Sequence, residues 1–168
     1  MSDKGANWID YYQQINIRGT QENEDFCQCL QSTLNLALPT KVGQTSVSST
    51  QKLMCLGPDE WLLVSKNRYD VFDNLWQIKK QLTQKAIHIS IVDLSHARDV
   101  LLFDNTNDQL NHYCPLDFST EAFPVNTAAQ SKLGHIDVIF YRLNKTQYEL
   151  YILQSMKSYT DELLSCLT

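Results

Sequence analysis

The chain has 168 residues, of which 43% are hydrophobic and 20% are charged, and its formal net charge is −5. This composition is typical of a folded globular protein and differs from that of a disordered chain. The negative charge argues against nucleic-acid binding, because duplex affinity comes mostly from Lys and Arg side chains that neutralise phosphates.

The glycines exclude several common sites. The chain has only five, and they are scattered: Gly5, Gly19, Gly43, Gly57 and Gly134. A dinucleotide-binding fingerprint, a P-loop and the nucleophile elbow of hydrolases each need two or more glycines close together. The sequence therefore contains none of these three motifs.

The cysteines indicate reduced thiols. There are five of them at irregular spacing, namely Cys27, Cys29, Cys55, Cys114 and Cys166, which does not indicate a disulfide framework. Cys27 and Cys29 would point in different directions from a helix, so a metal site is not favoured. The sequence shows neither an apolar secretory signal nor a membrane-length apolar run, so we expect a cytoplasmic protein that binds no metal.

The chain begins with a polar segment. We expect residues 1–14 to form an N-terminal arm. Its three aromatic side chains, Trp8, Tyr11 and Tyr12, are candidates for a docking patch, because a polar arm buries them poorly by itself. Residues 15–19 alternate in polarity and end in glycine, which predicts a short strand.

A helix and a hairpin are expected next. Residues 23–36 have apolar side chains at helical spacing and acidic residues at the start, and we expect Pro39 to end this helix. Residues 45–65 read as strands, with the turn Gly57-Pro58-Asp59-Glu60 joining two continuously apolar runs. Such runs predict a hairpin covered on both faces, by this chain's helices on one face and by its second lobe or a partner on the other.

The first half of the chain closes with a helix and a strand. The helix is expected over residues 69–84, with Asp70 near its start. Trp76 in this helix and Trp61 in the preceding hairpin are both assigned to the core. The strand is expected over residues 86–94.

The second half repeats this order loosely. We expect strands at 100–103, 135–143 and 147–153, a short helix at 106–113, an irregular stretch at 123–134 and a final helix at 156–167. Ser155 is expected to cap the final helix. Both halves follow a split βαββαβ order, so the fold class is α+β, with two intertwined ferredoxin-like lobes over about residues 15–94 and 95–168.

The densest polar cluster is Asp93-Leu94-Ser95-His96-Ala97-Arg98-Asp99. Ser, His and Asp so close together in sequence do not line up in the serial order of a catalytic triad. We expect Asp93, Ser95 and Arg98 to form a hydrogen-bonded knot that is structural or part of an interface. Cys114, which precedes a proline, is expected in a turn as a buried thiol. The residues alone thus indicate an α+β domain without a visible catalytic set.

Several segments taken together resemble the gamma subunit family of heterotetrameric sarcosine oxidase. They occur in family order over about residues 15–167, and they are Ile17-Arg18-Gly19, Leu34–Pro39, Cys55–Val64, Val92–Arg98, Cys114-Pro115-Leu116-Asp117, Phe123-Pro124, Ala128–Gly134 and the helix near Ser155. The string Leu-Gly-Pro-Asp-Glu-Trp-Leu-Leu over residues 56–63 is the most specific of them.

The resemblance implies a fold similar to the folate-binding domain of the glycine-cleavage T-protein. It also implies a non-catalytic subunit, without catalytic, cofactor-binding or metal-binding residues of its own. In such complexes the beta subunit carries the flavins that oxidise sarcosine, the alpha subunit carries the dinucleotide and the folate-linked domain, and a small delta subunit is also present. The resemblance thus places FAD, FMN, NAD and tetrahydrofolate on other subunits.

Seven residues within or beside the family motifs are candidates for contact with partner subunits: Arg18, Trp61, Asp93, Ser95, His96, Arg98 and Asp117. Internal hydrogen bonding or core packing is the alternative for each.

Two other functions also stay open: a stand-alone folate-site relative that binds a one-carbon carrier, and the equivalent subunit of a related N-methyl amino-acid dehydrogenase. The sequence does not separate the dehydrogenase from the oxidase, since the flavin subunit selects the substrate.

Overall fold

The computed structural model describes residues 6–9, 13–66, 72–106 and 108–166. The chain divides into two compact units. The central unit comprises residues 12–95, and the terminal unit comprises residues 1–11 together with residues 96–168. Tyr11, Tyr12 and Asp70, which the sequence analysis singled out, lie outside the described residues.

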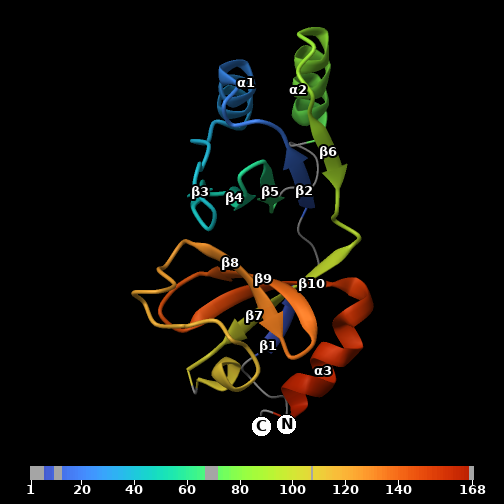
Figure 1. The fold of residues 1–168 in the computed structure, drawn as a ribbon. Helices are drawn as coiled ribbons and strands as arrows, with labels where there is room; N and C mark the ends of the chain where they lie inside the picture. The colour runs from blue at the N-terminus through green and yellow to red at the C-terminus, as the bar shows by residue number, and fades with distance from the viewer. Residues whose placement is uncertain (1–5, 10–12, 67–71, 107, 167–168) are drawn as a thin grey trace. The chain divides into compact units, whose positions relative to one another are not determined.

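The central unit is a five-stranded antiparallel sheet with two helices (Figure 1). Its elements in chain order are β2 (Gln13–Arg18), α1 (Glu24–Leu34), β3 (Thr45–Val47), β4 (Gln51–Gly57), β5 (Glu60–Ser65), α2 (Phe72–Gln84) and β6 (Ser90–Asp93). The strand order across the sheet is β3-β4-β5-β2-β6, which is the ferredoxin-like arrangement with β3 added at one edge.

Helix α1 starts and ends on side chains suited to each terminus. Asn23 is its N-cap and accepts a hydrogen bond from the backbone N–H of Phe26 at 3.0 Å, while two acids occupy the first turn. The helix stops at Leu34 because Asn35 takes a left-handed conformation with φ of 51°. The helix therefore ends two residues before the expected Leu36, and Asn35 rather than Pro39 ends it.

The core of the central unit lies between its helices and one face of its sheet. Helices α1 and α2 run side by side (Figure 1) and bury apolar residues against the strands, among them Phe26, Leu30 and Leu75. The β4–β5 hairpin is buried on both faces, as its continuous apolar runs predict. Trp61 is fully buried, but the assignment of Trp76 to the core was wrong, because 62% of its surface is exposed on α2.

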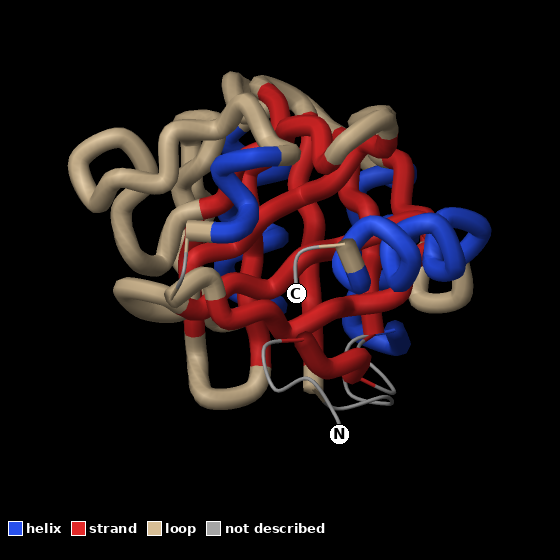
Figure 2. The backbone as a smooth tube through the Cα atoms, turned by 90° about the horizontal axis from the view of Figure 1, so that it is seen from below, coloured by secondary structure: helices blue, strands red, loops and turns tan. Residues whose placement is uncertain are grey.

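The terminal unit has a second five-stranded antiparallel sheet. Figure 2 shows the strands of the whole chain in red. Its elements are β1 (Ala6–Ile9), β7 (Arg98–Asp104), a 3₁₀ turn (Gln109–His112), β8 (Ala128–Leu133), β9 (Ile136–Arg142), β10 (Gln147–Leu153), a second 3₁₀ turn (Gln154–Met156) and α3 (Lys157–Ser165). The hairpin β9–β10 is confirmed at the predicted place.

The two sheets repeat one strand arrangement. The order β8-β9-β10-β7-β1 matches β3-β4-β5-β2-β6 position by position, and α3 follows β10 as α2 follows β5. The fifth position differs in its origin: β6 follows α2 in the chain, whereas β1 comes from the N-terminal segment. Residues 6–9 of the expected arm are therefore a strand, paired with β7 in the register Trp8↔Leu101.

Three further expectations were wrong in detail. Residues 128–133, expected to be irregular, form β8, which pairs along its whole length with β9. Ser155 lies inside a 3₁₀ turn and does not cap α3, whose N-cap is Met156 without a side-chain bond. Strand β6 begins only at Ser90, and Ala86, where the strand was expected to start, adopts a positive φ of 56° just after α2. No helix in the described part of the chain is long and apolar enough to cross a membrane.

Candidate functional site

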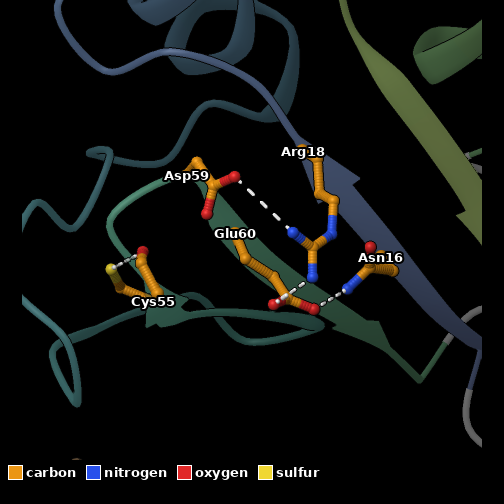
Figure 3. Close-up of polar contacts among 6 residues, drawn as sticks. Asn16, Arg18, Cys55, Asp59 and Glu60 are labelled. Atoms are coloured by element: carbon orange, nitrogen blue, oxygen red, sulfur yellow. Dashed lines mark hydrogen bonds and ion pairs between the residues drawn. The ribbon is translucent and has the colours of Figure 1, made fainter.

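Arg18 is the centre of a surface network on the central unit (Figure 3). It ends β2 directly opposite Glu60, the first residue of β5. Its Nη2 donates to Glu60 Oε2 at 2.7 Å, and its Nη1 lies 3.5 Å from Asp59 Oδ2. The other oxygen of Glu60 accepts from Asn16 Nδ2 at 2.6 Å. The β4–β5 turn and the end of β2 therefore form one charged, hydrogen-bonded rim.

The Arg18 network remains accessible to a partner. The side chains of Arg18 and Asp59 are 50% and 61% exposed, and that of Glu60 is 25% exposed. Exposed ion pairs of this kind contribute roughly 0–1 kcal/mol to stability. Their main effect here is to hold two carboxylates and a guanidinium in defined positions at the surface.

Trp61 lies beside this network in sequence but belongs to the core. Its indole Nε1 donates to the carbonyl oxygen of Pro39 at 2.8 Å, and its ring lies 5.5 Å from the ring of Phe26. With no exposed surface, it fits the core-packing alternative that the sequence left open. Cys55 opposite it is also buried. Desolvation raises the pKa of its thiol, although a hydrogen bond with the backbone of Gly57 acts in the other direction.

Asp93 and Ser95 form a small hydrogen-bonded turn where β6 ends. Asp93 Oδ1 accepts from both the backbone N–H and the hydroxyl of Ser95, at 2.9 and 2.5 Å. The hydroxyl oxygen of Ser95 in turn accepts from the backbone N–H of Gln14 at 3.0 Å. These contacts fasten the end of β6 to β2, and the carboxylate of Asp93 stays exposed. Two members of the expected knot, Asp93 and Ser95, are thus hydrogen-bonded to each other.

His96 and Arg98 belong to the terminal unit. His96 is exposed in the turn before β7, and Arg98 is the half-buried first residue of that strand. Arg98 borders a shallow hollow of about 500 Å³ on the sheet face, together with Gln130, Lys132, Asp137 and Tyr151. Lys132 and Asp137 form an exposed ion pair of 2.6 Å there.

Asp117 is exposed in the long connection between β7 and β8. Its Oδ1 accepts from the backbone N–H of Ser119 at 2.8 Å. This hydrogen bond, with a second one from the Ser119 side chain, lowers the pKa of the Asp117 carboxyl. Cys114, three residues earlier, is buried as expected, with its Sγ 3.6 Å from the hydroxyl of Ser131.

The seven candidate residues thus occupy several places. Arg18 and Trp61 lie on the paired strands β2 and β5 of the central unit. Asp93 and Ser95 lie at the end of β6, the last strand of that unit, which pairs with β2. The other three are distributed over the turn before β7, the start of β7 and the loop that holds Asp117. The described residues include no group of three or more His, Cys, Asp or Glu side chains placed to hold a metal ion.

Sequence reasoning missed the role of Arg142, a charged residue that is only 2% exposed. Its guanidinium donates to the backbone carbonyl oxygens of Phe118, Ser119, Phe123, Asn144 and Lys145. It also lies over the ring of Tyr148 at 5.3 Å. Arg142 therefore organises the loop that holds Asp117, and its place in a predicted apolar strand was the only signal in the sequence.

A family model decides the relationship of the chain to known proteins. The model described as "Sarcosine oxidase, gamma subunit family" matches residues 18–165. The chain belongs to this family. The match to the sarcosine oxidase gamma subunit family covers parts of both units, since it begins at Arg18 and ends at the last residue of α3.

Solved structures show the fold of this gamma-family chain in other proteins. A chain of the heterotetrameric sarcosine oxidase from Corynebacterium sp. U-96, in complex with pyrrole 2-carboxylate, matches with a TM-score of 0.86 and 24% identity, over 96% of this chain and 82% of that chain. The glycine cleavage system aminomethyltransferase T from Bartonella henselae matches with a TM-score of 0.64 and 16% identity, over 95% of this chain and 45% of that one. The comparison with curated proteins found no match.

Proposed function

We propose that this chain is the non-catalytic gamma subunit of a heterotetrameric sarcosine oxidase-like complex. In this proposal the complex demethylates sarcosine oxidatively to glycine and transfers the one-carbon unit to tetrahydrofolate. The family match over residues 18–165 carries the proposal. The likeness in fold to a chain of a heterotetrameric sarcosine oxidase supports it.

The partners in this proposal are the alpha and beta subunits, with a delta subunit in the same cytoplasmic complex. FAD, FMN, NAD and tetrahydrofolate are bound by these other subunits, and the gamma chain contributes binding surface. The Arg18 network suits such a role, because its charged groups are exposed and already held in place by one another before a partner arrives.

Purification of the tagged chain from its native host under mild conditions tests this function. We expect larger polypeptides with a flavin absorbance spectrum to co-purify in fixed proportion, and the preparation to oxidise sarcosine. Recovery of the chain alone, with no flavoprotein attached, contradicts the proposal. Turnover of other N-methyl amino acids in preference to sarcosine would assign the subunit to a related dehydrogenase instead.

Isothermal titration of the purified chain with tetrahydrofolate tests whether the chain lacks a cofactor site of its own. We expect no heat of binding for the isolated chain and measurable binding for the assembled complex. Binding by the isolated chain would favour a stand-alone folate-site protein.

A further inference from the structure

Helix α2 exposes a tryptophan in a basic setting. Trp76 is 62% exposed, and it lines a shallow groove of about 300 Å³ with Lys79, Lys80, Thr83 and Gln84. A second, smaller hollow of about 60 Å³ lies between Trp76, Leu75, Lys79 and Ile91. We call the set Trp76, Lys79, Lys80 and Thr83 the Trp76 patch. Large exposed aromatic side chains of this kind are over-represented at protein interfaces.

The charge of the Trp76 patch is opposite to that of the whole chain. The chain carries a net charge of −5, yet the residues that line the groove, among those whose side chains the structure describes, include two lysines and no acid. Within the described parts of the chain, no carboxylate forms an ion pair with Lys79 or Lys80. Lys79 lies instead over the indole of Trp76, with its Nζ 5.7 Å from the ring centroid. The patch therefore favours a negatively charged occupant.

The terminal unit contains a lysine, an indole and a carboxylate in contact, although its tryptophan comes from strand β1 and not from a helix. Lys157 belongs to α3, which follows β10 as α2 follows β5, and its Nζ lies 4.6 Å from the ring centroid of Trp8. The indole Nε1 of Trp8 donates to the carboxylate of Asp161 at 2.8 Å. In the Trp76 patch the lysine and the indole are both present, but among the described residues no acceptor meets the indole N–H.

We infer that the Trp76 patch is a docking site for an acidic segment of another subunit, in which a carboxylate accepts from the Trp76 indole and pairs with Lys79 and Lys80. This inference rests on the proposed function. The segment would lay an apolar side chain against the exposed indole ring while its acids neutralise the two lysines. Desolvation of the indole by such a segment would make Trp76 the dominant contact of this surface.

Oxidative footprinting of tryptophan, read by mass spectrometry, tests the inference on the isolated chain and on the complex purified through it. We expect Trp76 to be readily modified in the isolated chain and strongly protected in the complex. Trp61, which is buried, should react little in either sample. A complex that forms with Trp76 still reactive overturns the docking site and leaves the proposed function standing. If no complex forms, the proposed function fails and the docking site fails with it.

Substitutions measure the strength of the contact. We expect Trp76→Ala to weaken assembly with the partner subunits by about 30-fold or more. The double variant Lys79→Glu, Lys80→Glu should weaken it comparably, and added salt should weaken assembly of the wild type. Val42 is equally exposed at 62% and follows Lys41, so Val42→Ala and Lys41→Glu are matched controls that should assemble normally. Equal assembly by Trp76→Ala and wild type overturns the inference.

Light scattering on the isolated chain tests another occupant, a second copy. We expect a monomer for the wild type and for Trp76→Ala. A wild-type dimer that Trp76→Ala converts to monomer would show that the patch joins two copies of this chain, and would overturn the assignment to a partner subunit.

Discussion

Gly19 connects the surface network to the core through a very close approach. It follows Arg18, and its backbone N–H donates to the carbonyl oxygen of Asp59 at 3.1 Å. A Cβ added at this position would lie 2.2 Å from Cε2 of Phe26, which is fully buried beside Trp61. The absence of a side chain here allows the aromatic pair to pack directly under the end of β2.

Replacing Gly19 by alanine is expected to destabilise the protein by about 1–3 kcal/mol, because the buried ring of Phe26 has to move from its packed position. Urea unfolding followed by circular dichroism measures this change. Gly57→Ala is the matched control, since its nearest neighbour would be 3.5 Å away, and it should cost less than about 1 kcal/mol. Equal stability of the two variants would contradict the packing argument.

Arg142 is a buried charge that five backbone carbonyl oxygens stabilise, as described above. We expect Arg142→Met to destabilise the protein by about 3 kcal/mol, because several buried acceptors lose their donor at once. Arg142→Lys should recover little, since one ammonium lacks the forked geometry of a guanidinium.

Chemical denaturation and limited proteolysis together check this prediction for Arg142. Cleavage in the loop of residues 115–127 should become faster in both variants. Lys132→Met, which removes an exposed ion pair from the same sheet, serves as the control and should change the unfolding free energy by less than about 1 kcal/mol. An unchanged cleavage rate in Arg142→Met would show that the loop is ordered by other contacts.

At the level of elements, β1 and α3 depend on each other. Trp8 of β1 packs on the hydrophobic core of the terminal unit, and its indole reaches Asp161 of α3. Trp8 is one of the three aromatic residues that the sequence analysis made candidates for a docking patch, and it is partly buried within its own unit. Among the described side chains of the corresponding elements α2 and β6 no such indole–carboxylate pair is seen, and the exposed tryptophan lies on the helix instead.

Asp161→Ala is expected to lower the free energy of unfolding by about 1 kcal/mol, because the Trp8 indole loses its acceptor and Lys157 loses a nearby negative charge. Thermal unfolding monitored by tryptophan fluorescence measures the effect. Glu162→Ala removes the neighbouring exposed acid and should change stability by no more than about 0.5 kcal/mol. Comparable losses in the two variants would point to net charge rather than to the Trp8 contact.

For the whole molecule, the repeated strand order predicts a tolerated rearrangement of the chain. In the terminal unit β1 occupies the place that β6 occupies in the central unit, although it comes from the opposite end of the sequence. A circular permutant that begins at residue 12 and carries residues 1–11 after residue 168, joined by a flexible linker, would give both units the same element order.

We expect this permutant to fold and to unfold at a temperature within a few degrees of the wild type. A chain that simply lacks residues 1–11 should be clearly less stable, because β7 loses its neighbour and the core loses Trp8. Calorimetry on the three proteins makes the comparison. A permutant no more stable than the truncated chain would show that β1 needs its original connection to β2.

The sequence alone determined the local elements, because turn residues, caps and apolar runs act over a few neighbouring positions. The β4–β5 and β9–β10 hairpins and the α+β class follow from such signals, and the motifs within them identified the family. The tertiary structure decided what depends on distant partners: the pairing of β1 with β7, the strand at residues 128–133, and the burial of Arg142 beneath a loop. It also decided that Trp61 is enclosed and Trp76 exposed. Both tryptophans belong to apolar patterns in the sequence, but Trp61 on β5 is covered by Phe26 of α1, whereas Trp76 lies on a face of α2 that the core does not cover.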